Sequence, residues 1–217
     1  MRHDVDGEHD ALWSETFARL LALRRVPEGT FNDAMWSLQH YPALLVFYTV
    51  GVASVASGRE DLLIALGSDA EWRSPFNNSP AQPAAYAVRP DRVLDWDSVN
   101  SLSRWEGSKW QQPPSHLVRH EFATLASELI PQRPLSDVLD DVEFRHALLV
   151  HVTGNVPHGE MTGEYRGDKH WGGERLAETA TRFLSRGSRA GTSWPWWGLL
   201  GDDPEQRLAD FVAAVAW

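Results

Sequence analysis

The chain has 217 residues, with 30 acidic against 20 basic side chains and a formal net charge of −10. This balance argues against a general nucleic-acid binder, because neutralising phosphates requires clustered Lys and Arg. It also argues against binding to an anionic membrane surface. The absence of cysteine excludes disulfides, thiolate metal sites and cysteine nucleophiles.

The remaining composition is that of an ordinary globular chain, with 42% hydrophobic and 23% charged residues. We expect one helical domain over residues 1–217, a length that suffices to bury a core. The first ten residues are polar and lack the apolar segment of a secretion signal, so we expect a cytoplasmic location. Residues 1–9 are expected to be disordered.

The first predicted helix spans Ala11 to Arg25, where apolar residues recur at helical spacing and Glu15, Arg19 and Arg24 would face water. Thr30 is expected to cap a short second helix. The side chains predicted to point inward are Leu12, Phe17, Leu20, Leu21 and Leu23, followed by Phe31, Ala34, Met35 and Leu38.

The most apolar stretch begins at Tyr41 and carries no charge as far as Gly58. Pro42 suits the first turn of a helix, and a glycine that can take a positive φ suits its end. The charged residues from Arg59 to Asp61 then precede a second apolar segment, residues 62–66. We therefore predict a buried helical hairpin.

The length of this apolar run lies near the border between a core helix and a membrane span, which needs about 20 apolar residues. Its serines, the charges that follow it and the lack of a flanking Lys or Arg cluster favour the core helix. We therefore expect no membrane insertion, and other helices must cover the run on all sides.

Beyond the hairpin, helices are predicted to alternate with two long irregular loops. Prolines rule out a long helix between residues 68 and 93, where Ala85 to Val88 is predicted to form a short strand. The later helices are predicted over Val93–Leu102 with Asp97 as cap, Ser115–Ile130 with Ser115 as cap, Val142–Val152, 173–184, Trp194–Leu200, and from an Asp203 cap onward. With about eight helices, the fold class is mainly α, as a multi-helix bundle or a short solenoid-like stack.

Two histidines raise the question of a metal site. His116 and His120 are four residues apart on one predicted helix face, a spacing that can bind zinc. They do not form the HExxH arrangement, and a third ligand such as His146 or His151 would have to come from elsewhere. We favour surface histidines over a metal site, and we expect no cofactor.

An acidic cluster lies where a helix is expected to begin: Asp137, Asp140, Asp141 and Glu143. Paired carboxylates could serve acid–base chemistry or hold Mg²⁺. Acidic residues at a helix start are explained more simply by a favourable interaction with the helix dipole. We prefer this structural interpretation.

The segment from residue 151 to 173 is the strongest candidate for function, because it combines histidines and carboxylates with several glycines. It matches neither the P-loop nor the dinucleotide-binding fingerprint, and the chain has no GxSxG elbow. A plain connecting loop is the simpler interpretation. The alternative is a hydrolase, metal-dependent or not, that uses these groups.

Eleven tryptophans are present, which either fill space between helices or form a recognition surface. We favour packing for most of them. The candidate residues for a partner or ligand surface are Arg104, Trp105, Trp110, His158, Arg166, His170 and Trp171.

Three segments together resemble a known group of proteins: YPALLVFYTVGVASVASGREDLLIAL, EFRHALLVHVTGNV and WPWWGLLGDDPEQRLADFVAAV. They resemble the helical C-terminal regions of large bacterial, especially actinobacterial, multidomain proteins of the antiphage-effector type. In those proteins a sirtuin-like, Toll/interleukin-receptor-like or nuclease-like domain comes first. The resemblance implies an accessory or sensing portion without the catalytic domain, and it assigns no active-site residue.

The sequence therefore predicts a non-catalytic interaction or regulatory module. Its partner would be another protein or domain, and self-association is left open.

Overall fold

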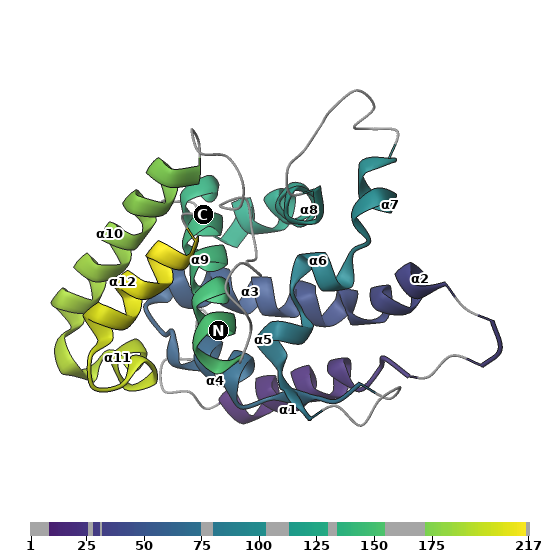
Figure 1. Cartoon of the computed structure of the whole chain (residues 1–217), viewed down its shortest axis with the longest axis horizontal. Helices are drawn as coiled ribbons and strands as arrows, with labels where there is room; N and C mark the ends of the chain where they lie inside the picture. The colour runs from purple at the N-terminus through teal and green to yellow at the C-terminus, as the bar shows by residue number, and fades with distance from the viewer. Residues whose placement is uncertain are drawn as a thin grey trace.

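The computed structural model describes residues 9–25, 28–30, 32–74, 80–102, 113–129, 134–154 and 172–215, and the fold is mainly α-helical (Figure 1). The longer helices are α1 (Asp10–Leu21), α3 (Tyr41–Ser57), α4 (Asp61–Ser68), α8 (Pro113–Leu129), α9 (Leu135–Thr153), α10 (Gly172–Ala190) and α12 (Pro204–Val215). The shorter ones are α2 (Asp33–Ser37), α5 (Ala84–Ala87), α6 (Pro90–Val93), α7 (Trp96–Asn100) and α11 (Pro195–Leu200), with 3-10 turns η1 (Leu38–His40) and η3 (Gly191–Ser193).

The predicted fold class is confirmed, although the helices are more numerous than expected. The extra ones are single turns such as α5 and α6, which are too short to show a helical period in the sequence. Two short strands, β1 (Glu71–Trp72) and β2 (Gln82–Pro83), form an antiparallel pair in which Glu71 lies opposite Pro83.

The predicted central hairpin is present as α3 followed by α4. Pro42 lies in the first turn of α3, and Gly58 ends the helix in the left-handed conformation with φ of 87°. The Gly58 amide donates to the carbonyl of Ser54 at 2.8 Å, which satisfies one of the last carbonyls of α3. In the described part of the chain, one helical stretch, Asp33–Ser57, is long and apolar enough to cross a membrane, and more than half of its most apolar window is buried inside the fold.

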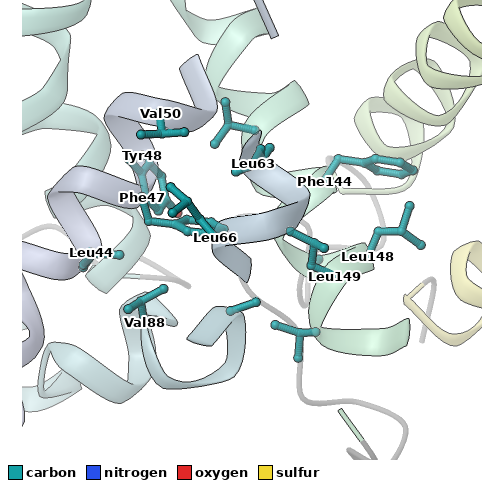
Figure 2. Close-up of a cluster of buried hydrophobic side chains, with 14 of the residues drawn as sticks. Leu44, Phe47, Tyr48, Val50, Leu63, Leu66, Val88, Phe144, Leu148 and Leu149 are labelled. Carbon is teal, nitrogen blue, oxygen red and sulfur yellow. The ribbon is translucent and has the colours of Figure 1, made fainter. Parts of the chain in front are cut away.

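The core forms where α9 crosses α3 and α4 (Figure 1). Figure 2 shows the buried side chains that meet there, among them Phe47 and Tyr48 of α3, Leu63 and Leu66 of α4, and Leu148 and Leu149 of α9. Gly51 lets α9 approach α3 closely, since a Cβ at this position would lie 2.8 Å from a methyl group of Val142. The α3 helix is therefore covered by protein on the face that meets α9.

A second aromatic cluster joins α10 to α11. The ring of Phe183 lies 4.5 Å from that of Trp194 and 5.5 Å from that of Trp196, centroid to centroid. Trp196 is fully buried and Trp194 almost so. The packing interpretation is confirmed for these two tryptophans, because both rings are buried rather than forming a surface. The ring of Trp194 also fills the space beside Gly187, together with that of Trp197.

Several predicted boundaries and caps were wrong. The segment Ala84–Ala87, predicted as a strand, is helix α5. Asp95 rather than Asp97 caps α7, because the Asp95 carboxylate accepts the amide of Ser98 at 2.8 Å. Asn32 rather than Thr30 caps α2 through the amide of Ala34. The Asp203 cap of α12 is confirmed by the amide of Gln206 at 3.0 Å.

The helices around the core are also longer than predicted. Ser115, the predicted cap, lies inside α8, which begins at Pro113. The α9 helix begins at Leu135 and includes the acidic cluster that was placed before it. The α10 helix continues to Ala190. Three leucines and one methionine that were predicted to point inward are exposed: Leu12, Leu23, Met35 and Leu38.

Glu60, between α3 and α4, is fully buried and holds four elements together. Its carboxylate accepts bonds from Arg145 of α9, with Nε at 2.6 Å and Nη2 at 3.0 Å. Arg186 of α10 places its Nε 2.8 Å from the same carboxylate, and Trp196 of α11 donates its indole N–H to it. Two charges and one neutral donor thus compensate the buried anion.

The carboxylates of α9 form the second half of this network. Asp140 and Glu143 both bind Arg119 of α8, at 2.6 Å and 2.5 Å. Asp140 also binds Arg175 of α10, and further along α10 the guanidinium of Arg182 lies 3.0 Å from Asp141. Arginines spaced along one face of α10 therefore fix that helix to α9.

We predict that Gly187→Ala destabilises the protein by about 1–3 kcal/mol, because the new methyl group would overlap the rings of Trp194 and Trp197. Urea unfolding measures the effect. The control is Gly198→Ala in α11, where a Cβ meets nothing within 4 Å. The control should be neutral or stabilising by up to about 1 kcal/mol, and equal effects at both sites would contradict the packing.

We predict that Glu60→Gln lowers the free energy of unfolding by about 3–5 kcal/mol, because it leaves Arg145 and Arg186 without their shared carboxylate. The matched control is Glu15→Gln, which breaks an exposed pair with Arg19 and should cost less than about 1 kcal/mol. A loss at Glu60 no larger than at Glu15 would show that the buried carboxylate does not hold the helices.

Candidate anion-binding site

A hollow of about 350 Å³ opens between α2, the β1–β2 pair and the short helices α5 and α6. We call it the Arg24 pocket. Its walls consist of aromatic rings, two arginines, one carboxylate and a few neutral residues: Arg24, Trp36, Ser37, Trp72, Ser74, Pro80, Gln82, Tyr86, Ala87, Asp91 and Arg92. The helices and strands around this hollow are short, and each of them contributes one or two side chains to its rim.

Arg24 contacts two tryptophan rings that are tilted by 54° to each other. Its guanidinium carbon is 3.6 Å from the ring centre of Trp36 and 4.9 Å from that of Trp72. Cation–π contact of this kind holds the planar group in one orientation. The only hydroxyl that it reaches is that of Ser37, at 3.3 Å from Nη2, and its Nε is buried without a hydrogen-bond partner among the described residues.

His40 lies beneath this arginine and is fully buried. Its Nε2 is 3.1 Å from the carbonyl of Leu21, which can only accept, so Nε2 carries the proton. Its Nδ1 therefore presents a lone pair to Arg24, at 3.5 Å from Nη1. Burial, followed by the charge of Arg24, lowers the pKa of His40 to about 4, so the ring is neutral at pH 7.

The pocket holds more positive than negative charge. Burial, and then the charge of Arg92, lowers the pKa of Arg24 to about 10. Asp91 is engaged elsewhere, because Arg89 donates to both of its oxygens, at 3.0 Å from Nε and 2.5 Å from Nη2. Within the described chain, Arg24 forms no ion pair with a carboxylate.

The arrangement suits binding rather than catalysis. A desolvated arginine attracts an anion, and the exposed parts of the aromatic walls offer planar apolar surface to whatever carries it. His40 is neutral and contacts the backbone of Leu21 and Arg24, and Asp91 is paired with Arg89, so both side chains are already committed.

None of the candidate surface residues predicted from the sequence can be placed. Arg104, Trp105, Trp110, His158, Arg166, His170 and Trp171 all lie outside the described residues. The same holds for most of the 151–173 loop, so the hydrolase alternative stays a prediction. In its place, the structure brings together Arg24, predicted to face water, and Trp36 and Trp72 from segments 36 residues apart.

The histidines proposed as metal ligands do not form a described cluster. His120 is mostly exposed, at 63%, beside Glu121. His146 is fully buried, and its Nε2 donates to the carbonyl of Ala85 at 2.7 Å. The side chain of His116 lies outside the described part of the chain. Among the groups that the structure describes, no three His, Asp or Glu side chains are placed to hold a metal ion.

The acidic cluster requires a correction. Asp137 alone lies in the first turn of α9, where the helix dipole favours a negative charge. Asp140, Asp141 and Glu143 are buried and paired with arginines of α8 and α10. Their role is therefore to join helices, which the pattern within α9 alone did not indicate.

No protein-family model, curated protein or solved structure matches this chain. We therefore infer the function from the geometry of the described residues.

We predict that stability falls as the pH is lowered from 7 to 5, because burial depresses the pKa of both His40 and His146 to about 4. The unfolded chain, with histidine pKa near 6.5, then binds protons that the folded chain does not. The stabilisation is complete above pH 6.5 and disappears as the pH falls toward 4. Each histidine should cost about 2 kcal/mol at pH 5, measured by urea unfolding.

A variant pair isolates this effect. His146→Gln can still donate to the carbonyl of Ala85 but cannot titrate, so it should remove about half of the histidine-linked loss. His120→Gln, at an exposed position, should leave the pH dependence unchanged. An unaltered pH dependence in His146→Gln would contradict the assignment.

Proposed function

We propose that the protein is a non-catalytic binding module of a regulatory or sensing kind. Its ligand is a small organic anion with a planar ring, which binds in the Arg24 pocket. The observation that carries the proposal is the guanidinium of Arg24, which contacts the rings of both Trp36 and Trp72 and has no carboxylate partner among the described residues.

In the protein without ligand, the surroundings of Arg24 are energetically unfavourable for its positive charge. The charged form of Arg24 is destabilised by its burial and by a second positive charge nearby. The lowered pKa of Arg24 reflects this destabilisation. A bound anion supplies an opposite charge in direct contact with the guanidinium, beyond the charge of Asp33 nearby, and hydrogen bonds between ionised groups are among the strongest in proteins. Because the ring contacts already fix the guanidinium, little side-chain entropy is lost on binding.

The volume and walls of the pocket indicate the size and shape of the ligand. About 350 Å³ lies at the lower end of small-molecule sites, which favours a single ring with an acidic group over a polymer. Tyr86 and the tryptophans offer apolar surface, while Gln82 and Ser74 supply neutral polar groups.

The Arg24 pocket is built from several separate elements, and this construction gives ligand binding a way to regulate the protein. The lining side chains belong to the segment that follows α1, to α2, to the β1–β2 pair and the residues beside it, and to α5 and α6. A ligand that contacts several of these short elements stabilises one arrangement of them, and it shifts the protein toward that arrangement by its differential affinity. The protein or domain partner predicted from the sequence would then respond to this change.

The test is calorimetric titration with benzoate, phenyl phosphate and adenosine monophosphate, compared with uncharged benzamide. We expect at least one aromatic anion to bind, and Arg24→Gln to weaken it by about 10- to 100-fold, the value of a hydrogen bond to a charged group. The control Arg207→Gln removes the same charge from an exposed position on α12 and should leave binding unchanged.

Two outcomes would overturn the proposal. One is that none of the anions binds at 10 mM while circular dichroism shows a folded protein. The other is that Arg24→Gln and Arg207→Gln weaken binding equally. The loss of affinity would then depend on the net charge of the protein and not on the Arg24 pocket.

A further inference from the structure

A second hollow, of about 380 Å³, lies on the α10 side of α9 and shares no lining residue with the Arg24 pocket. Figure 1 shows α10 beside α9, on the opposite side of the molecule from α2. The residues that line it are all of polar or charged types: Asp141, Arg145, Thr181, Arg182, Ser185, Arg186 and Arg189. We call it the α10 arginine pocket.

The spacing along α10 explains why these groups converge. Arg182, Ser185, Arg186 and Arg189 follow one another at intervals of three, one and three residues, which places them on one face of the helix. Arg145 reaches the same hollow from α9. Four arginines therefore line one small volume in a protein whose net charge is −10.

The carboxylates nearby compensate only part of this charge. Arg145 and Arg186 share Glu60, and Arg182 binds Asp141 through Nε at 3.0 Å. Glu60 and Asp141 thus pair with three of these arginines, whereas Arg189 forms no ion pair with a described carboxylate.

Donor groups also remain available on this face. Arg182 uses Nε and Nη2 on Asp141 and Thr179, which leaves Nη1 without a partner in the described chain. Arg189 donates Nε to the carbonyl of Ser185 at 3.2 Å, and its two terminal nitrogens meet no described acceptor. The hydroxyl of Ser185 lines the same hollow.

We propose that the α10 arginine pocket binds a phosphate group, either free or at the end of a small metabolite. Guanidinium forks match the oxygens of phosphate in pairs, and a tetrahedral anion can accept from several directions at once. A carboxylate has only two oxygens in one plane, so it satisfies fewer of these donors. A nucleic acid is disfavoured, because the acidic remainder of the protein repels a long polyanion.

The site also lies where occupancy has a structural effect. Arg182 and Arg186 already connect α10 to Asp141 and Glu60. A bound phosphate relieves the repulsion among the arginines that make these connections. It binds the folded protein and not the unfolded chain, so it should raise the melting temperature in proportion to the logarithm of its concentration.

The experiment is isothermal titration with inorganic phosphate, pyrophosphate and glycerol phosphate, each against sodium chloride of equal ionic strength. Tighter binding of glycerol phosphate than of phosphate would assign the site to a metabolite, and the reverse order to the free ion. Arg189→Gln should weaken binding about 10-fold or more, because Arg189 is exposed and belongs to no described ion pair that holds the fold.

The matched control is Arg207→Gln on α12, which removes one exposed positive charge outside the hollow and should change the affinity less than about 2-fold. Ser185→Ala provides a second variant without a charge change, and a several-fold loss is expected. The proposal is overturned if no phosphate compound binds at 10 mM, or if the Arg189 and Arg207 variants behave alike. Since the two hollows have no residue in common, neither result bears on the Arg24 pocket.

Discussion

One buried carboxylate, that of Glu60, sets the arrangement of the helices. It lies in the turn of the central hairpin and meets Arg145 of α9, Arg186 of α10 and Trp196 of α11. A charge removed from water is tolerated only when its partners are in place, so these helices cannot shift independently. Apolar packing between α3 and α9 drives burial, whereas the carboxylate specifies which helix faces meet.

Buried charges are compensated in different ways at the two candidate sites. Glu60 is paired with two arginines and Asp141 with Arg182, while Arg189 on the open side of α10 forms no ion pair with a described carboxylate. Around Arg24 the compensation comes from tryptophan rings rather than from a carboxylate. In both places the fold presents positive charge at a hollow, although the chain as a whole is acidic.

The sequence predicted the hairpin because its signals are local: an uncharged run, Pro42 at one end and Gly58 at the other. Single-turn helices and the true caps Asn32 and Asp95 were missed, since several adjacent polar residues could each serve as a cap. The Arg24 pocket could not be predicted, because its residues come from separate segments. Glu60 stood in a run of three charges that resembled a solvated turn, and only tertiary contacts distinguish it from Asp61.

The turn at Gly58 has a further role that involves α10. Arg186 extends from α10 to donate to the carbonyl of Val55 at 2.8 Å, which places a cation at the negative end of the α3 dipole. A Cβ on Gly58 would approach the same guanidinium to 3.2 Å, in a backbone conformation that side chains already disfavour. The residue at position 58 must therefore satisfy two requirements at once. It reverses the chain after α3, and it leaves room for Arg186 of α10, a helix more than a hundred residues later in the sequence.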